Sequence, residues 1–394
     1  MLLEALIKIA ILIGGLMTAA AYLVLVERWM AAWIQGRIGP NRVGVPLTRI
    51  RLFGLGQPIA DGLKFILKEE YVPAHVDKWL YYLAPMAILT AALAAFAVIP
   101  FGSVLPPDVS FPGGEEPIQL VVAPGIDVGM LYVFALSSMA IYGVTLGGWA
   151  SNNKYSFLGG LRSSAQLIAY EIPLGLGILG VVLMTGSLRL EEIIGAQAQS
   201  GLWFAFSQPL GLLVFSVAAC AEAGRLPFDL PEAEQELVGG YHTEYAGMKL
   251  MMYLVGEFLH MITAAFLIVI LFFGGWHLWG VTGSSNDVNW FQAIARILVL
   301  VTKILLVVLL FMLVRWSWPR FRFDQLMALA WKVMLPLGLV HLFTMAVLSE
   351  YAERWAGGAA PWVIVGVGWL VAVAACLVAG TLTAVSTGNQ AIRE

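Results

Sequence analysis

The feature that most constrains the fold of this chain is a series of long apolar runs. Nine stretches carry about 20 mostly apolar residues each, the length at which an α-helix crosses roughly 30 Å of hydrocarbon. The bilayer core offers no water to backbone polar groups, so segments of this kind have to be helical. The runs lie near residues 6–26, 79–100, 128–149, 167–186, 203–221, 251–275, 293–314, 326–348 and 361–382.

The composition agrees with a membrane protein. Of 394 residues 60% are hydrophobic and 12% are charged, whereas an ordinary soluble domain is about 25% charged. The first run is long enough to span and lacks a signal-peptide cleavage pattern, which indicates a retained helix. We therefore predict an all-α polytopic membrane protein with about nine transmembrane helices, forming one transmembrane domain over residues 1–394.

Net charge and cysteine content exclude further functional classes. The net charge of −3 gives no indication of nucleic-acid binding. Cys220 and Cys376 lie far apart without CxxC spacing, so neither a disulfide framework nor a thiolate metal site is indicated. We expect no metal site in this chain.

The distribution of basic residues predicts the orientation. The odd-numbered loops hold most of the lysines and arginines, whereas the even-numbered loops hold only Arg189 and Arg354. Cytoplasmic loops carry the excess of positive charge in most membrane proteins. The odd loops are therefore expected to be cytoplasmic, with the N-terminus outside and the C-terminus inside.

The first loop, residues 27–78, contains a predicted amphipathic helix. Its apolar face comprises Ile59, Leu63, Ile66 and Leu67, and its polar face Asp61, Lys64 and Lys68. This pattern is typical of a helix that lies at the membrane surface. The preceding "GRIGPNRVG" constrains the backbone around Arg37 and Arg42, so two interpretations stay open: a membrane-surface anchor, or a site for a polar head group.

The densest negative charge falls in the loop at residues 222–249, whose sequence begins "EAGRLPFDLPEAEQELVGGYHTEYAG". Six carboxylates accompany a single arginine, Arg225; they are Glu222, Asp229, Glu232, Glu234, Glu236 and Glu244. Asp229 and Glu232 could cap a helix, but capping explains two acids at most. Carboxylates crowded in a poorly solvated place raise one another's pKa, so such a set can pass protons.

Several ionisable residues fall inside the apolar runs. Glu171 and Glu257 would each cost about 2.5–3.5 kcal/mol at a lipid-facing position, so both are expected to face an interior. A buried acid that only fixes helix packing is the simpler alternative. Lys303 and Lys332 are plausible partners for these acids. A haem bound by His260 and His341 is disfavoured, because their neighbours form no ligand motif.

Five segments together point to one family. They are "GRIGPNRVG", "QPIADGLKFILKE", "SNNKYSFLGGLRSSAQLIAYEIPLG", "RLPFDLPEAEQELVGGYHTEYAGMK" and "PRFRFDQLMALAWKVMLPL". In this order, over roughly residues 20 to 340, the chain resembles the H subunit of proton-pumping NADH:quinone oxidoreductase, respiratory complex I, and its mitochondrial equivalent. The resemblance implies a bacterial inner-membrane protein that binds quinone, either ubiquinone or menaquinone. FMN and iron–sulfur clusters would belong to peripheral-arm partners, and other neighbours would be membrane-arm subunits and lipid.

The resemblance also implies roles for particular residues. Those implied for the quinone chamber are Arg28, Arg37, Asp61, Lys64, Phe228, Asp229 and Glu232. Those implied for an acidic proton path are Glu171, Glu222, Glu234, Glu236, Glu244 and Glu257. Where many relatives have "ERK" and "ETNR", this chain has Glu27-Arg28-Trp29 and Glu222-Ala223-Gly224-Arg225, and its last run, 361–382, exceeds the eight-helix core of some members.

Two alternatives remain. A stand-alone cation or proton transporter could use the same acids, but no internal repeat and no discontinuous helices in matched halves are predicted. A membrane anchor of a related hydrogenase would lack quinone, which the full set of quinone-side motifs disfavours.

Overall fold

A computed structural model of the chain describes residues 2–44, 53–106, 118–230, 234–279, 281–282, 288–356 and 360–391. The named secondary-structure elements of these residues are all helices, and one isolated antiparallel bridge joins Val104 and Gln119. The predicted all-α fold is confirmed.

Eight helical segments of the described chain are long and apolar enough to cross a membrane. Seven of them are the single helices α1 (Leu2–Ile34), α3 (Lys78–Ala95), α4 (Gly129–Ala150), α5 (Lys154–Thr185), α10 (Gly247–Phe272), α11 (Trp290–Ser317) and α14 (Ala360–Ala391). The eighth is a continuous helical run that comprises α12 (Phe323–Ala328), the π-helix η2 (Leu329–Met334) and α13 (Leu335–Ala356). The predicted amphipathic helix is α2 (Gln57–Leu67), which has no buried residue. Five shorter helices complete the description: α6 (Leu190–Ser200), α7 (Phe204–Ser207), α8 (Pro209–Glu222), α9 (Glu234–Leu237) and the 3₁₀ helix η1 (Gly240–His242).

The fifth predicted run, 203–221, differs from the expectation of a continuous helix. It divides into α7 and α8 (Pro209–Glu222) at Gln208, whose backbone (φ −129°, ψ 57°) is not helical. A proline disfavours the helical conformation of the residue before it and has no N–H to donate, which explains the break at this position. A single break of this kind does not contradict the sequence prediction, which concerned discontinuous helices in matched halves of the chain.

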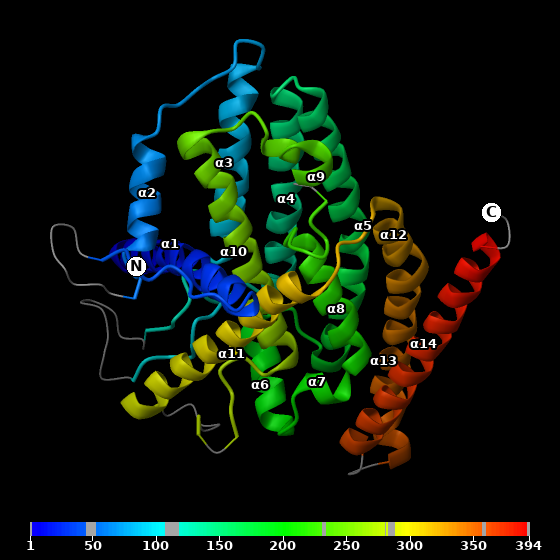
Figure 1. Cartoon of the computed structure of the whole chain (residues 1–394). Helices are drawn as coiled ribbons and strands as arrows, with labels where there is room; N and C mark the ends of the chain where they lie inside the picture. The colour runs from blue at the N-terminus through cyan, green and yellow to red at the C-terminus, as the bar shows by residue number, and fades with distance from the viewer. Residues whose placement is uncertain are drawn as a thin grey trace.

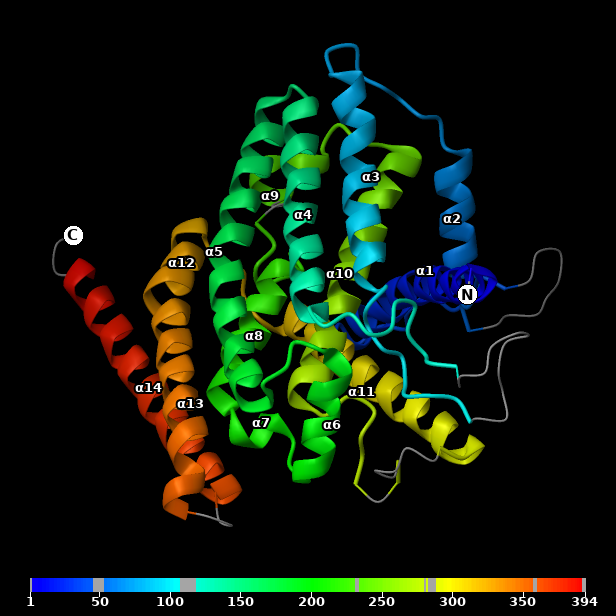
Figure 2. The same ribbon diagram turned by 180° about the vertical axis from the view of Figure 1, so that it is seen from behind.

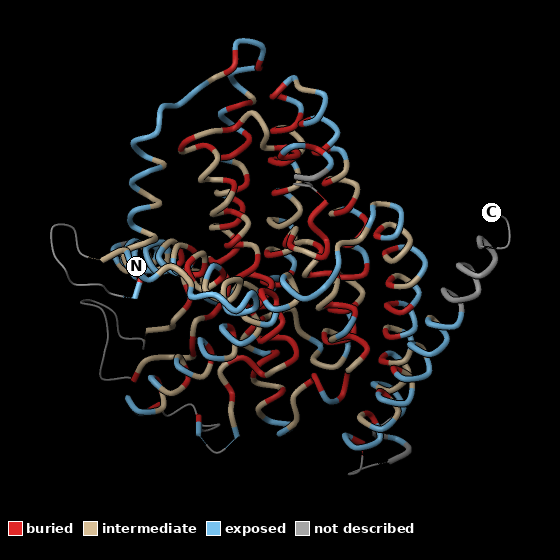
Figure 3. Tube along the Cα trace, in the orientation of Figure 1, coloured by how far each residue is buried: buried red, intermediate tan, exposed pale blue. Residues whose placement is uncertain are grey.

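The long helices form a group around α10 (Figures 1 and 2). Helices α3, α4, α5 and α10 run roughly alongside one another, whereas α1 and α11 cross the group at a steep inclination. Helices α13 and α14 cover the side of α5 and α8, and burial is greatest in the interior of the group (Figure 3). Since 78% of the most apolar stretch of α10 is buried, its polar residues face protein rather than lipid.

Small residues allow the elements near the acidic loop to approach closely. A Cβ atom added at Gly148 of α4 would lie 2.8 Å from the Ser156 carbonyl oxygen of α5. A Cβ atom added at Gly159 of α5 would lie 2.7 Å from backbone atoms of Gly240 and Tyr241 in η1. Gly159 thus lets η1 lie directly on α5.

The substitution Gly159→Ala should displace η1 and lower the free energy of unfolding by about 2 kcal/mol, as overpacking does in a close-packed interior. Gly175→Ala is the matched control in the same helix, because nothing lies within 4 Å of its added Cβ atom. That variant should be neutral or slightly stabilising, since alanine favours a helix over glycine. The thermal unfolding midpoints in mild detergent compare the two; equal midpoints would contradict the close contact.

Candidate functional site

A large cavity of about 610 Å³ lies between α1, α2, α10 and α11. Three predicted chamber residues line it: Arg28, Arg37 and Asp61. The Arg28 guanidinium Nη1 lies 2.7 Å from Asp61 Oδ2, and Gln57 donates to the other carboxylate oxygen at 3.0 Å. Much of the remaining wall is apolar side chains of α1. We call this space the large cavity; its charged end and apolar wall suit an amphipathic ligand.

Of the other four predicted chamber residues, the three that the structure describes do not line the large cavity. Lys64 is exposed on α2. Phe228 is buried, with its ring centroid 5.6 Å from both Tyr170 and Phe321. Asp229 Oδ2 lies 3.4 Å from the Arg320 guanidinium. Glu232, including its proposed part in a helix cap, lies outside the described residues.

A buried ion-pair network closes the inner end of the large cavity. Helix α8 ends at Glu222, and Gly224, with φ +63°, reverses the chain and carries Arg225 into the interior. The Arg225 guanidinium lies 3.4 Å from a Glu27 oxygen and 3.9 Å from a Glu257 oxygen, and 4.2 Å from the centroid of the Phe258 ring. Arg315 of α11 binds the other Glu27 oxygen. The sequence analysis did not predict Glu27 or Arg315 as site residues. The sequence feature that could have indicated them is that each directly follows an apolar run, 6–26 for Glu27 and 293–314 for Arg315.

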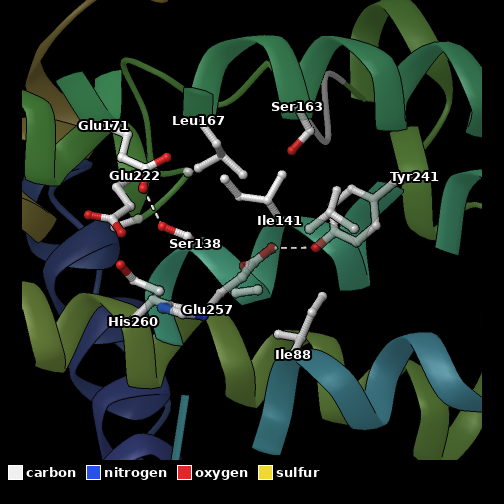
Figure 4. Close-up of a pocket in the computed structure, with 15 residues that line it drawn as sticks. Ile88, Ser138, Ile141, Ser163, Leu167, Glu171, Glu222, Tyr241, Glu257 and His260 are labelled. Carbon is white, nitrogen blue, oxygen red and sulfur yellow. Dashed lines mark hydrogen bonds between the residues drawn. The ribbon is translucent and has the colours of Figure 1, made fainter. Parts of the chain in front are cut away.

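A smaller cavity of about 60 Å³ lies between α4, α5, α8 and α10 (Figure 4). Three of the predicted proton-path acids, Glu171, Glu222 and Glu257, line it. Ser138 donates a hydrogen bond to Glu171, and the Tyr241 hydroxyl donates to Glu257 Oε1 at 3.1 Å. We call this space the acidic cavity. Both intramembrane acids therefore face the interior, as their desolvation cost predicts.

The remaining predicted acids take other positions. Glu236 pairs with Arg162 at 2.7 Å and its side chain is about half exposed, and Glu244 accepts a hydrogen bond from Asn153 at 2.6 Å. Neither lines the acidic cavity. The backbone of Glu234 belongs to α9, but its side chain lies outside the described part of the chain. The roles of these three acids stay predictions.

Aromatic and polar contacts hold η1 and the segment after it. The Tyr81 hydroxyl donates to the Glu244 carbonyl at 2.8 Å, and the Tyr81 and Tyr245 rings stack with centroids 4.3 Å apart. Ser156 donates to the Tyr241 carbonyl at 2.7 Å. Burial raises the pKa of Tyr245 to about 12, so this phenol stays neutral at physiological pH. These contacts fix the Tyr241 hydroxyl at the edge of the acidic cavity.

Among the described residues the two intramembrane lysines form no ion pair with the acids, contrary to the sequence expectation. Lys303 Nζ donates instead to the carbonyl oxygens of Phe273, Gly275 and His277, at 2.7, 2.9 and 2.7 Å. These carbonyls follow the C-terminal end of α10, where a cation is favourable. Lys332 is exposed in η2. Lys303 therefore caps a helix end rather than neutralising a carboxylate.

The two intramembrane histidines line different cavities. His260 lies at the acidic cavity, whereas His341 lines a small space beside the α7–α8 break with Gln208. A Cβ atom added at Gly180 or Gly211 would lie 2.2 or 2.5 Å from His341 Nε2, so the imidazole fills a slot between α5 and α8.

The fold and cavities together define a polytopic membrane protein with a charged interior. The chain matches the NADH dehydrogenase family over residues 7–346 and belongs to that family. It is 46% identical to an NADH-quinone oxidoreductase H subunit of Geobacter metallireducens over 336 residues, 85% of this chain and 93% of that protein. It is 45% identical to the NADH-quinone oxidoreductase H subunit of Leptospira biflexa over 356 residues, 89% and 96% of the two chains. Helix α14 follows the residues that match the family.

Replacing Arg225 with glutamine should lower the free energy of unfolding by about 3 kcal/mol, because the partly buried carboxylate of Glu257 then loses this cation. Arg189→Gln is the control. Arg189 pairs with Glu192 at 3.0 Å on the surface, and loss of such an exposed pair costs about 1 kcal/mol or less. The thermal unfolding midpoints of the two variants in detergent are compared. An equal loss of stability in both variants would contradict a buried role for Arg225.

Proposed function

We propose that this chain is the membrane subunit of an NADH:quinone oxidoreductase. In this proposal the chain forms one wall of the quinone-binding chamber and couples quinone reduction to proton translocation through buried carboxylates. The observation that carries the proposal is that Glu257 lines both the large cavity and the acidic cavity. One carboxylate can therefore respond to charge in the first and exchange protons with the second.

The dimensions and lining of the large cavity support quinone as its ligand. Its volume of about 610 Å³ falls within the usual range for small-molecule sites. The α1 side chains Met17, Ala20 and Val24 offer an apolar wall for an isoprenoid tail, and Arg28 and Arg37 offer donors for carbonyl oxygens of the head group. Either ubiquinone or menaquinone suits this chemistry.

The ion-pair network supports the coupling. Reduction of a quinone to a quinol takes up two electrons and two protons, and the electrons would come from FMN and iron–sulfur clusters in peripheral-arm partners. Negative charge arriving in the large cavity attracts the Arg225 guanidinium and weakens its interaction with Glu257. Each 1.4 kcal/mol lost from that interaction raises the proton affinity of Glu257 about tenfold. A proton can then pass between Glu257 and the other acids of the same cavity, Glu222 and Glu171.

The remaining predicted residues complete the proposal. Glu234, Glu236 and Glu244 would deliver protons along the loop that approaches the acidic cavity. Lys64 would lie at the entrance of the chamber, and Phe228, Asp229 and Glu232 beside the quinone path. The chain would act as one transmembrane domain with the basic loops on the cytoplasmic side, the N-terminus outside and the C-terminus inside. Peripheral-arm subunits would dock on that cytoplasmic side, and membrane-arm subunits beside the helices.

The substitution Glu257→Gln in the assembled complex should slow both NADH-driven quinone reduction and proton pumping by at least about tenfold, because the amide cannot carry a proton between the cavities. Glu350→Gln is the control, since Glu350 forms an exposed pair with Arg354 near the end of α13. Wild-type rates of both processes in the Glu257 variant would disprove the coupling role.

A second test addresses the chamber. Arg28→Gln should raise the KM for a short-chain quinone about tenfold, which corresponds to loss of one charge-assisted contact of about 1.5 kcal/mol. Rates at saturating quinone should change much less. Arg354→Gln, far from the large cavity, should leave the KM as it is. An unchanged KM in the Arg28 variant would argue against a head-group contact at this residue.

A further inference from the structure

A histidine joins the acidic cavity to a second space deeper in the helix group. A cavity of about 20 Å³ lies between α4, α8 and α10, and it shares Ser137, Glu222, Ala223 and His260 with the acidic cavity. From His260 it continues along α10 past Thr263 to Leu267. At 1.5 Å per residue this distance is about 10 Å along the helix axis, directed away from the acidic loop.

The His260 side chain reaches into the acidic cavity from α10, alongside Glu222 and Glu257 (Figure 4). Its Nε2 atom is buried and has no hydrogen-bond partner among the described residues. A buried polar atom left unpaired is costly, and several other such atoms occur among the described residues. The His260 side chain also lines two adjoining cavities, where a water molecule can reach it. The acidic cavity has room for a few water molecules and the deeper cavity for one.

We propose that His260 is a proton-carrying residue that extends the path of carboxylates from Glu222 into the deeper cavity; this inference rests on the proton-translocating function proposed above. In the step, Nε2 of the neutral imidazole accepts a proton, directly or through water, as protonated Glu222 becomes a carboxylate. The resulting imidazolium then releases one proton to water in the deeper cavity and returns to the neutral form. One proton moves, and no electron or additional reactant is needed.

The charges around His260 favour this exchange. Among the described residues that line the two cavities, the ionisable groups are Glu222 on α8, Glu171 on α5, Glu257 on α10 and the Tyr241 hydroxyl on η1. Arg225 lies beyond Glu257, with which it pairs. Three carboxylates near the imidazole stabilise its cationic form, whereas burial opposes it. These opposed effects suit a group that gains and loses a proton within one catalytic cycle.

The test uses the assembled complex reconstituted in liposomes. His260→Gln keeps a polar side chain but removes the titratable group. We expect NADH-driven quinone reduction and proton pumping to fall about tenfold, less than the loss typical of a general acid–base group, because water can replace part of the relay. The pH profile of the coupled rate should also lose the contribution of one titrating group, an effect that a packing defect would not produce.

His341→Gln is the matched control, because His341 also lies in a membrane helix with a buried Nε2 that has no hydrogen-bond partner in the described chain. It lines no part of the acidic cavity. That variant should lower the yield or thermal stability of the complex and leave the pH profile of the assembled fraction unchanged.

Further variants separate failure of this inference from failure of the proposed function. If His260→Gln does not assemble, His260→Asn is measured in the same way. The role of His260 would be overturned if an assembled His260 variant kept the wild-type rates and pH profile while Glu222→Gln was slowed. That result would leave the carboxylate path intact. Wild-type pumping in both Glu222→Gln and Glu257→Gln would overturn the proposed function itself.

Discussion

The interior of this protein depends on one buried cation, the guanidinium of Arg225. A charge removed from water is stable only when opposite charges replace its hydration, and Arg225 finds Glu27 of α1 on one side and Glu257 of α10 on the other. Arg315 adds α11 to the same network through Glu27. Helices that cross at different inclinations are thereby joined at one point, between the large cavity and the acidic cavity.

The acidic loop is positioned by packing rather than by its charges. Tyr81, Tyr245 and Tyr253 form a buried aromatic cluster, and Gly159 allows η1 to rest on α5. As a result Tyr241 is the residue of η1 that lines the acidic cavity, and it donates to Glu257. The close glycine contacts explain how a loop of high negative charge can lie against apolar helices with defined geometry.

Two departures from regular α-helix occur on the opposite side of the group, near α13 and α14. The chain breaks between α7 and α8 at Gln208, where the amide donates to the Gly180 carbonyl. The π-helical segment η2 precedes α13, and the Tyr170 hydroxyl binds the Leu326 carbonyl just before it. Gly368 of α14 packs against the Ser207 carbonyl, so α14 covers the break. Such interruptions leave backbone groups that neighbouring side chains have to satisfy.

The sequence by itself determined the class of fold, the approximate spans and the family, because apolar length and long motifs are local properties. It also predicted that Glu171 and Glu257 face an interior, since the cost of exposing a carboxylate to lipid does not depend on which helix lies opposite. The family resemblance implied a shared chamber for Arg28, Arg37 and Asp61; the three residues line one cavity, and their role in quinone binding stays a prediction.

Only the tertiary structure decided which charges meet. The sequence suggested Lys303 as a partner of the acids, but the lysine caps the end of α10, and the cation that pairs with Glu257 is Arg225. Glu27, Arg315 and His260 became visible as parts of the site when α1, α8, α10 and α11 were placed together. Pairing across a helix group depends on inclination, rotation and close glycine contacts, and these properties arise from packing between segments far apart in the chain.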